Sequence, residues 1–181
     1  MGDIYSGLRA STLTPAQRDY ADVHLRILSG LYGMLRPYDG VMPYRLEMGY
    51  RLPEAPYTNM YAFWGETIAN CLPGSGLIVN LASIEYSRTV MPFVDAARVV
   101  APKFLTKDPK TGEPTFVVVH AKIARGAFAR WLITSKTTAV EKLSEFADIG
   151  YRYDAASSTS AEPVFVCGTF AGKGLSVRLQ E

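Results

Sequence analysis

Four arginines lie close together in a segment that is also rich in glycine, proline and tyrosine. They are Arg26, Arg36, Arg45 and Arg51, all within residues 24–52. The planar guanidinium fork matches the oxygens of a phosphate or a carboxylate, and glycine lets a ligand approach the backbone closely. The segment therefore predicts a site that holds an anion.

Further polar residues lie where predicted elements begin or end. Asn80 and Ser83 are at the end of an apolar run of strand length, residues 76–82, and Lys122 and Arg125 open a helix expected over 121–135. Ligands usually bind at the carboxyl ends of strands in α/β sheets, and a helix N-terminus favours an anion. The candidate anion-binding or nucleic-acid-binding residues are Arg36, Arg45, Asn80, Ser83, Lys122, Arg125 and Arg130. We expect Arg36, Arg45, Lys122 and Arg125 to line one concave, positive surface.

Three interpretations of these residues stay open. A binding protein would use the cations to neutralise phosphates and the tyrosines to stack on bases. An enzyme would use the same cations to hold a phosphorylated or nucleotide-like substrate, with Glu47 or Glu85 as a general base. In the third interpretation, Arg36 and Arg45 form internal ion pairs with these two glutamates and fix the loop.

The sequence lacks the residues and motifs that metal catalysis, serine hydrolysis and nucleotide binding through glycine-rich loops require. Two histidines nearly a hundred positions apart and two isolated cysteines leave a metal ion with carboxylates alone, so neither a metal site nor a cofactor is predicted. The sequence contains no GxSxG motif, no GxGxxG motif and no P-loop. His24 falls on the apolar face of a predicted helix, which favours a histidine packed in the core.

Helices are predicted over three main stretches. Thr14–Gln17 has the pattern of a capping box, and it opens a helix whose apolar face is formed by Tyr20, Val23, Ile27, Leu28 and Leu31. Gly30 or Gly33 is expected to end this helix. A second helix is expected over 57–72. The third, over 121–135, has a basic face around Gly126 and Ala129, and a shorter helix is expected over 140–146.

Strand patterns alternate with these helices. Residues 97–105 and 115–120 predict a hairpin around a polar turn, and two more strands are expected over 150–154 and 163–167. The mixture predicts an α+β fold: one domain with a mixed sheet and at least three helices. The sheet should have an open edge.

Composition is that of a globular chain in a reducing compartment. The 181 residues are 48% hydrophobic, and 19 basic against 17 acidic residues leave a charge of +2, so any basic surface must be local. Cys71 and Cys167 fit reduced, buried thiols. With neither a secretory signal nor a long apolar run, the sequence predicts a cytoplasmic protein and no membrane partner.

Long collinear blocks resemble the YaaA family of bacterial peroxide-stress proteins. The blocks are GDIYSGL at 2–8, HLRILSGLYGMLRPYD at 24–39, PYRLEMGYRL at 43–52, YAFWG at 61–65, IVNLASIEYS at 78–87, AKIARGAFARW at 121–131 and GYRYDAASS at 150–158. Several blocks in the same order are far more specific than any one motif.

The resemblance implies a function and an extent. Members are associated with protection from hydrogen peroxide, with limiting the damage that iron and peroxide do to DNA, and with DNA binding through a basic cleft and a helix-hairpin-helix element. It implies non-sequence-specific DNA as the partner, and no particular catalytic reaction follows from it. Residues 1–181 resemble the C-terminal two thirds of a member, as one domain that lacks the N-terminal region, with a divergent tail at 169–181.

Overall fold

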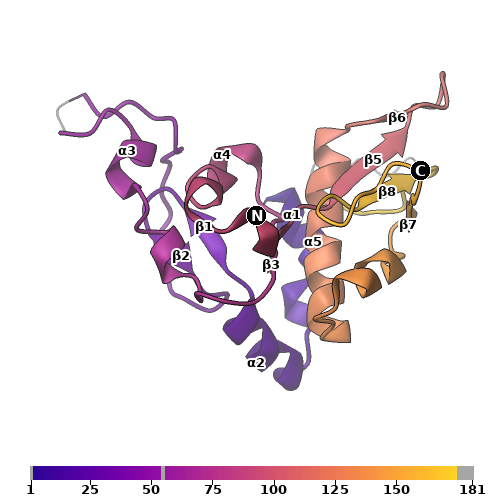
Figure 1. Ribbon diagram of the computed structural model, residues 1–181, viewed down its shortest axis with the longest axis horizontal. Coiled ribbons are helices and arrows are strands. Elements are labelled where there is room, and N and C mark those ends of the chain that lie inside the picture. Colours follow the sequence, from indigo (N-terminus) through magenta and orange to yellow (C-terminus); the bar gives the residue numbers. More distant parts are fainter. Residues whose placement is uncertain (1, 54–55, 175–181) are drawn as a thin grey trace. The chain divides into compact units, whose positions relative to one another are not determined.

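The computed structural model describes residues 2–53 and 56–174. The described residues form two compact units, one containing 2–18, 79–81 and 100–174, and the other containing 19–53, 56–78 and 82–99. Helices and strands occur together, and the main sheet is mixed, so the predicted α+β class is confirmed (Figure 1). The predicted tail begins at residue 169, and its part from 175 to 181 lies outside the described residues.

The first unit contains a sheet of four strands. Its order is β6 (Pro114–Thr115), β5 (Lys103–Lys107), β8 (Val164–Cys167) and β7 (Tyr151–Tyr153). Strands β5 and β6 form a hairpin around the predicted polar turn. The single strand expected over 97–105 was wrong, because Ala96–Arg98 is a 3₁₀ helix and β5 begins only at Lys103. Strand β7 pairs antiparallel with β8. The central pair, β5 and β8, is parallel, with Phe104 opposite Phe165. Strands β6 and β7 are the edges of this sheet.

Helix α5 (Val118–Ser135) packs against the sheet through an aromatic core. Phe104, Phe128, Phe146, Phe165 and Tyr151 are all almost fully buried, with ring centroids about 5 to 6 Å apart. The helix begins three residues earlier than predicted. Residues 118–120 were expected to be a strand, but β6 ends at Thr115, and the chain turns into the helix at once.

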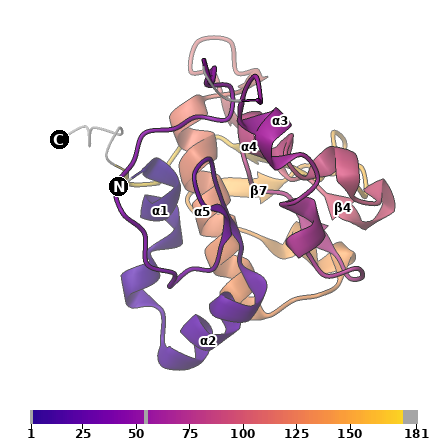
Figure 2. The ribbon, with the colours of Figure 1, turned by 90° about the vertical axis from the view of Figure 1, so that its left-hand side faces the viewer.

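The first unit also contains short helices at both ends of its sequence. Helix α1 (Asp3–Leu8) lies beside α5 (Figures 1 and 2). The contact is backbone to backbone: a Cβ on Gly126 would lie 1.8 Å from the carbonyl oxygen of Ile4, and one on Gly7 would lie 1.9 Å from that of Ile123. The 3₁₀ helices η1 (Ala10–Thr12) and η5 (Val140–Glu145) complete this unit, the latter where a short helix was predicted.

This contact corrects the predicted open strip on α5. Gly126 and Ala129 were expected to form a shallow basic face, but both are buried. The glycine and alanine positions exist because a second helix needs close approach there, and a larger side chain would push the two backbones apart.

Helix α2 (Pro15–His24) ends much earlier than predicted. Its capping box is confirmed, since the Thr14 amide donates to Gln17 Oε1 at 2.9 Å and the Gln17 amide donates to Thr14 Oγ1 at 3.3 Å. The helix stops at His24, however, and not at Gly30 or Gly33. The core location expected for His24 was wrong, because this side chain is exposed and stacks on Tyr20 at 4.1 Å.

A β-hairpin takes the place of the end of that helix. Strand β1 (Ile27–Ser29) pairs antiparallel with β2 (Gly33–Leu35), and Gly33 has a φ of +72°. The glycines that were expected to end a helix therefore close a tight turn. Trp64 Nε1 donates a hydrogen bond to the Gly30 carbonyl oxygen at 2.9 Å, which holds the turn against the next helix.

The rest of the second unit consists of short elements. The expected helix at 57–72 was too long, because α3 covers only Met60–Trp64 and the chain then passes into η2 (Ala69–Cys71). Cys71 was expected to be buried and is exposed, whereas Cys167 is buried and both thiols are free. The other elements of this unit are α4 (Ile84–Ser87), η3 (Met91–Phe93) and η4 (Ala96–Arg98). The two-residue strands β3 (Ile78–Val79) and β4 (Val99–Val100) lie at the boundaries of the two units, with one residue of each strand in either unit.

Candidate functional site

The predicted site residues are divided between the two units. Asn80, Lys122, Arg125 and Arg130 belong to the first, and Arg36, Arg45, Glu47, Ser83 and Glu85 belong to the second. Each group is described within its own unit, and the expectation that both line one surface stays a prediction.

Arg125 stands apart from the other predicted cations. It lies on α5, its side chain is half-buried, and burial lowers the pKa of its guanidinium. Within the described part of the chain it makes neither a hydrogen bond nor an ion pair. A guanidinium remains cationic at physiological pH even so. Arg125 therefore carries a positive charge that has lost part of its hydration without gaining a protein partner.

Lys122 is one helical turn before Arg125 and is exposed. It too has no ion pair with any residue that the structure describes. Positions three apart on a helix lie on neighbouring parts of one face, so both cations are available to the same anionic partner. Asn80 lies in the same unit, where its backbone N–H donates to the Val100 carbonyl oxygen at 2.8 Å.

Arg130, a predicted anion-binding residue, contacts the end of a neighbouring helix. Its guanidinium donates to the carbonyl oxygens of Leu8 at 3.2 Å and Arg9 at 3.0 Å, at the C-terminal end of α1. Arg9 has a φ of +49° and pairs with Asp148 at 3.3 Å. Burial, and then the neighbouring Arg9 charge, lower the pKa of Arg130, while Asp148 raises it. Arg130 thus holds the C-terminal end of α1 through its Nη1 group.

In the second unit, residues 36–52 form a long loop with many exposed side chains. Tyr38, Met42 and Tyr50 are more than half exposed. Arg36 pairs with Asp22 at 3.5 Å and Asp39 at 4.0 Å, and its amide donates to Asp39 Oδ2 at 2.7 Å. The internal pairs of Arg36 with Glu47 or Glu85 considered from the sequence do not occur, because Arg36 pairs with these two aspartates at the surface.

Arg45 and Glu47 form an ion pair of 2.7 Å that lies almost entirely in solvent. The Arg45 side chain is 91% exposed and that of Glu47 58%. An exposed pair of this kind is weak, so it neither fixes the loop nor keeps Arg45 from another anion. Arg51 is also exposed in the same loop.

Glu85 holds the loop to the body of the second unit. Its Oε1 accepts the amide of Met48 at 3.0 Å, and Met48 is completely buried. The Glu85 carbonyl oxygen accepts the hydroxyl of Tyr61 at 2.9 Å, which connects α4 with α3. Ser83 precedes this helix as its N-cap, with no side-chain capping bond. The contacts of Glu85 favour a positioning role over the general-base role considered from the sequence.

Sequence reasoning missed a polar chain inside the first unit. Thr106 Oγ1 lies 3.1 Å from His120 Nδ1 and 3.1 Å from the hydroxyl of Tyr151. His120 also stacks on Phe170 at 3.9 Å. Burial raises the pKa of Tyr151 to about 12 against the hydrogen bond from Thr106, and burial lowers the pKa of His120. Only the position of Thr106 at the end of a parallel strand could have signalled this cluster.

No group of three or more potential metal ligands occurs among the residues that the structure describes. The same residues include no helix that is both long enough and apolar enough to cross a membrane.

Comparison with known proteins shows which family the chain belongs to. The family model of the peroxide stress protein YaaA matches residues 1–157. The chain belongs to the YaaA family. A UPF0246 protein of Salinispora tropica is 63% identical over 177 residues, which cover 98% of this chain and 67% of that protein. The predicted family is confirmed, and with it the general association with peroxide stress.

Proposed function

We propose that this YaaA-family protein limits iron and peroxide damage in the bacterial cytoplasm by binding DNA. The contacts are mainly to backbone phosphates, so binding has no strong sequence preference. A protein that covers the phosphates also displaces the counterions condensed on them, iron among them, and keeps peroxide chemistry away from the bases.

The observation that carries this proposal is the state of Arg125. Its guanidinium is half-buried, burial lowers its pKa, and the described residues offer it no carboxylate or carbonyl oxygen. Removing a charge from water is costly unless an opposite charge or a hydrogen bond compensates for it. A phosphate would supply both through a bidentate contact, which arginine makes better than lysine.

Two features support the same partner. Lys122 adds a second cation on the same face of α5. In the second unit, the loop at 36–52 offers Arg45 and Arg51 beside exposed tyrosines, a combination typical of surfaces that bind nucleic acids. The overall charge of +2 is too small to attract DNA by itself, so local cations must do so.

A salt titration of DNA affinity tests the proposal. Fluorescence anisotropy with a short labelled duplex would give the dissociation constant at several salt concentrations for the protein and for Arg125→Gln and Lys122→Gln. Each lost phosphate contact should lower the log-log slope by about 0.9 and weaken binding similarly on unrelated sequences.

Lys110 supplies a matched control, because it is an exposed lysine in the hairpin turn after β5. Lys110→Gln removes the same charge as Lys122→Gln, and we expect it to leave the slope unchanged. If all three variants behave alike, or if affinity does not depend on salt, phosphate binding by this face of α5 is wrong.

A further inference from the structure

A small cavity lies where α5 ends and the chain enters η5. It has a volume of about 230 Å³ and is lined by seven residues, Ser135–Ala139, Lys142 and Glu145. A water molecule occupies roughly 30 Å³ of liquid, so the cavity has room for a small organic molecule, although it is smaller than the pockets of about 300 Å³ and more that hold larger ligands.

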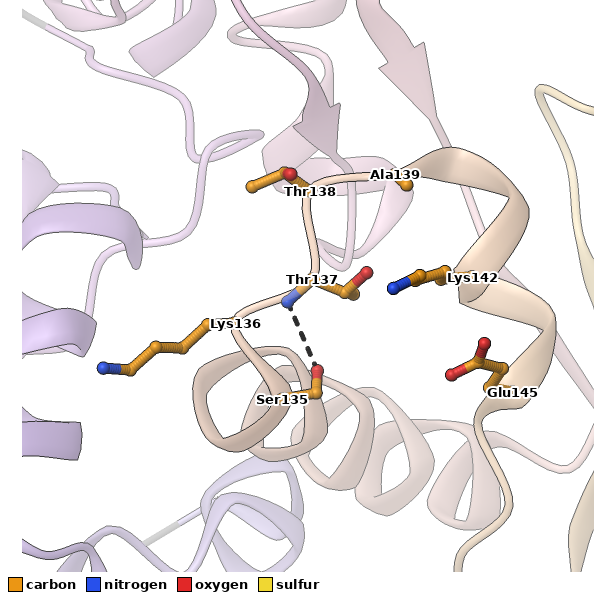
Figure 3. A pocket seen from close by; sticks show the side chains of 7 residues that line it. All are labelled: Ser135, Lys136, Thr137, Thr138, Ala139, Lys142 and Glu145. Carbon is orange, nitrogen blue, oxygen red and sulfur yellow. Dashed lines mark hydrogen bonds between the residues drawn. The ribbon is translucent and has the colours of Figure 1, made fainter.

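The lining includes a hydroxyl group whose hydrogen-bonding capacity is unused. Thr137 Oγ1 is buried, and none of the residues that the structure describes donates to it or accepts from it. In Figure 3 this hydroxyl points toward the ammonium of Lys142, and the two do not bond. A ligand group that reaches the Thr137 hydroxyl would therefore gain a hydrogen bond without displacing a partner among the described residues.

The charges around the cavity are of both signs. Lys142 and Glu145 are three positions apart in a 3₁₀ helix, which places them on the same side of it. Neither forms an ion pair with any part of the chain that the structure describes. Lys136 points away from the other lining side chains in Figure 3, so Lys142 is the cation that faces the cavity.

We propose that this cavity binds a small zwitterion of the α-amino acid type. The ligand's carboxylate accepts hydrogen bonds from the Lys142 ammonium and the Thr137 hydroxyl, and its ammonium group faces the Glu145 carboxylate. A dianion such as a phosphate fits less well, because Glu145 repels it. This site is independent of the DNA-binding surface proposed above.

Titration of the whole chain followed by amide NMR signals tests the site, with glycine as the probe. Acetate and methylammonium carry one half of glycine each and serve as matched probes at the same ionic strength. We expect saturable shifts at residues 135–145 with glycine, and at least about tenfold weaker responses with acetate and with methylammonium.

Substitutions separate the two halves of the site. Thr137→Val keeps the size of the side chain, and both it and Lys142→Met should weaken glycine about tenfold, whereas Lys136→Met should have no effect. Glu145→Gln should weaken glycine about threefold and strengthen acetate. Equal, unsaturable shifts with all three probes would overturn the proposal, and so would glycine affinity that is the same in Thr137→Val, Lys142→Met and Lys136→Met.

Discussion

Replacement of Glu85 decides between a positioning role and a chemical one. In the structure its carboxylate accepts the backbone amide of Met48 at 3.0 Å, and Met48 is completely buried in a cluster with Met60 of α3. Glu85→Ala would leave that buried amide without an acceptor. We therefore expect the second unit to unfold more easily, and any binding surface on the loop to be lost with it.

The size of the effect follows from the type of bond. A hydrogen bond to an ionised group contributes about 1.5 to 3 kcal/mol, and an orphaned buried amide costs about 1 to 3 kcal/mol. Glu85 is half-buried, so we expect Glu85→Ala to lower the free energy of unfolding by about 2 kcal/mol. Glu85→Gln keeps an oxygen acceptor without its charge and should cost about 1 kcal/mol. Glu47→Ala, at the exposed ion pair, should cost less than about 0.5 kcal/mol.

Tryptophan fluorescence provides a selective assay. The chain has two tryptophans, Trp64 in the second unit and Trp131 in the first. In a Trp131→Phe background, urea unfolding reports on Trp64 alone, and the cost of this replacement cancels in the comparison. If Glu85→Ala destabilises the second unit no more than Glu47→Ala does, or if Glu85→Gln abolishes an activity without any loss of stability, the positioning role is refuted.

Two further predictions concern the first unit. Gly126→Ala places a Cβ 1.8 Å from the Ile4 carbonyl oxygen, which forces α1 and α5 apart. Alanine also gains about 1 kcal/mol in helix propensity, so we expect the free energy of urea unfolding to fall by a net of about 2 kcal/mol. Gly40→Ala, at a site where a Cβ would meet nothing within 4 Å, is its control. The pKa of His120 is lowered from 6.5 by burial, so the unfolded chain binds more protons, and stability should fall as pH drops below about 6.5 until the lower folded-state pKa is passed. In thermal unfolding measured across pH, His120→Gln should remove the loss of stability at low pH. His24→Gln, at the exposed histidine, should keep that loss. Equal pH profiles for the two variants would contradict the role given to His120.

The elements that could be predicted are those that depend on local signals. The polar turn between β5 and β6 and the capping box of α2 act within a few residues of each other. The helix predicted over residues 25–35 was wrong because the apolar spacing of these residues suits both a helix and a hairpin. Contacts from a distant residue stabilise the hairpin: Trp64 bonds to Gly30, and its ring lies so close to Gly33 that an added Cβ would be 2.9 Å away. Such contacts are invisible to periodicity.

The same limit applies to the site. Arg130 binds carbonyl oxygens about 120 positions away in the chain, and Glu85 binds the amide of Met48, 37 positions before it. The sequence alone does not distinguish an arginine that binds the carbonyl oxygens at a helix end from an arginine that binds a ligand. The residue types of the site could be predicted, but the partner of each charge required the fold.

Arg125 and Arg130 show why the partner is the deciding fact. Both lie on α5, and burial lowers the pKa of both. At Arg130 the cost of burial is offset by two carbonyl oxygens at the end of α1, so its charge serves the fold. At Arg125 no described residue supplies such an oxygen, and this difference is the observation behind the proposed phosphate contact. The proposed partner therefore concerns Arg125 and the exposed Lys122, and not every basic residue of this helix.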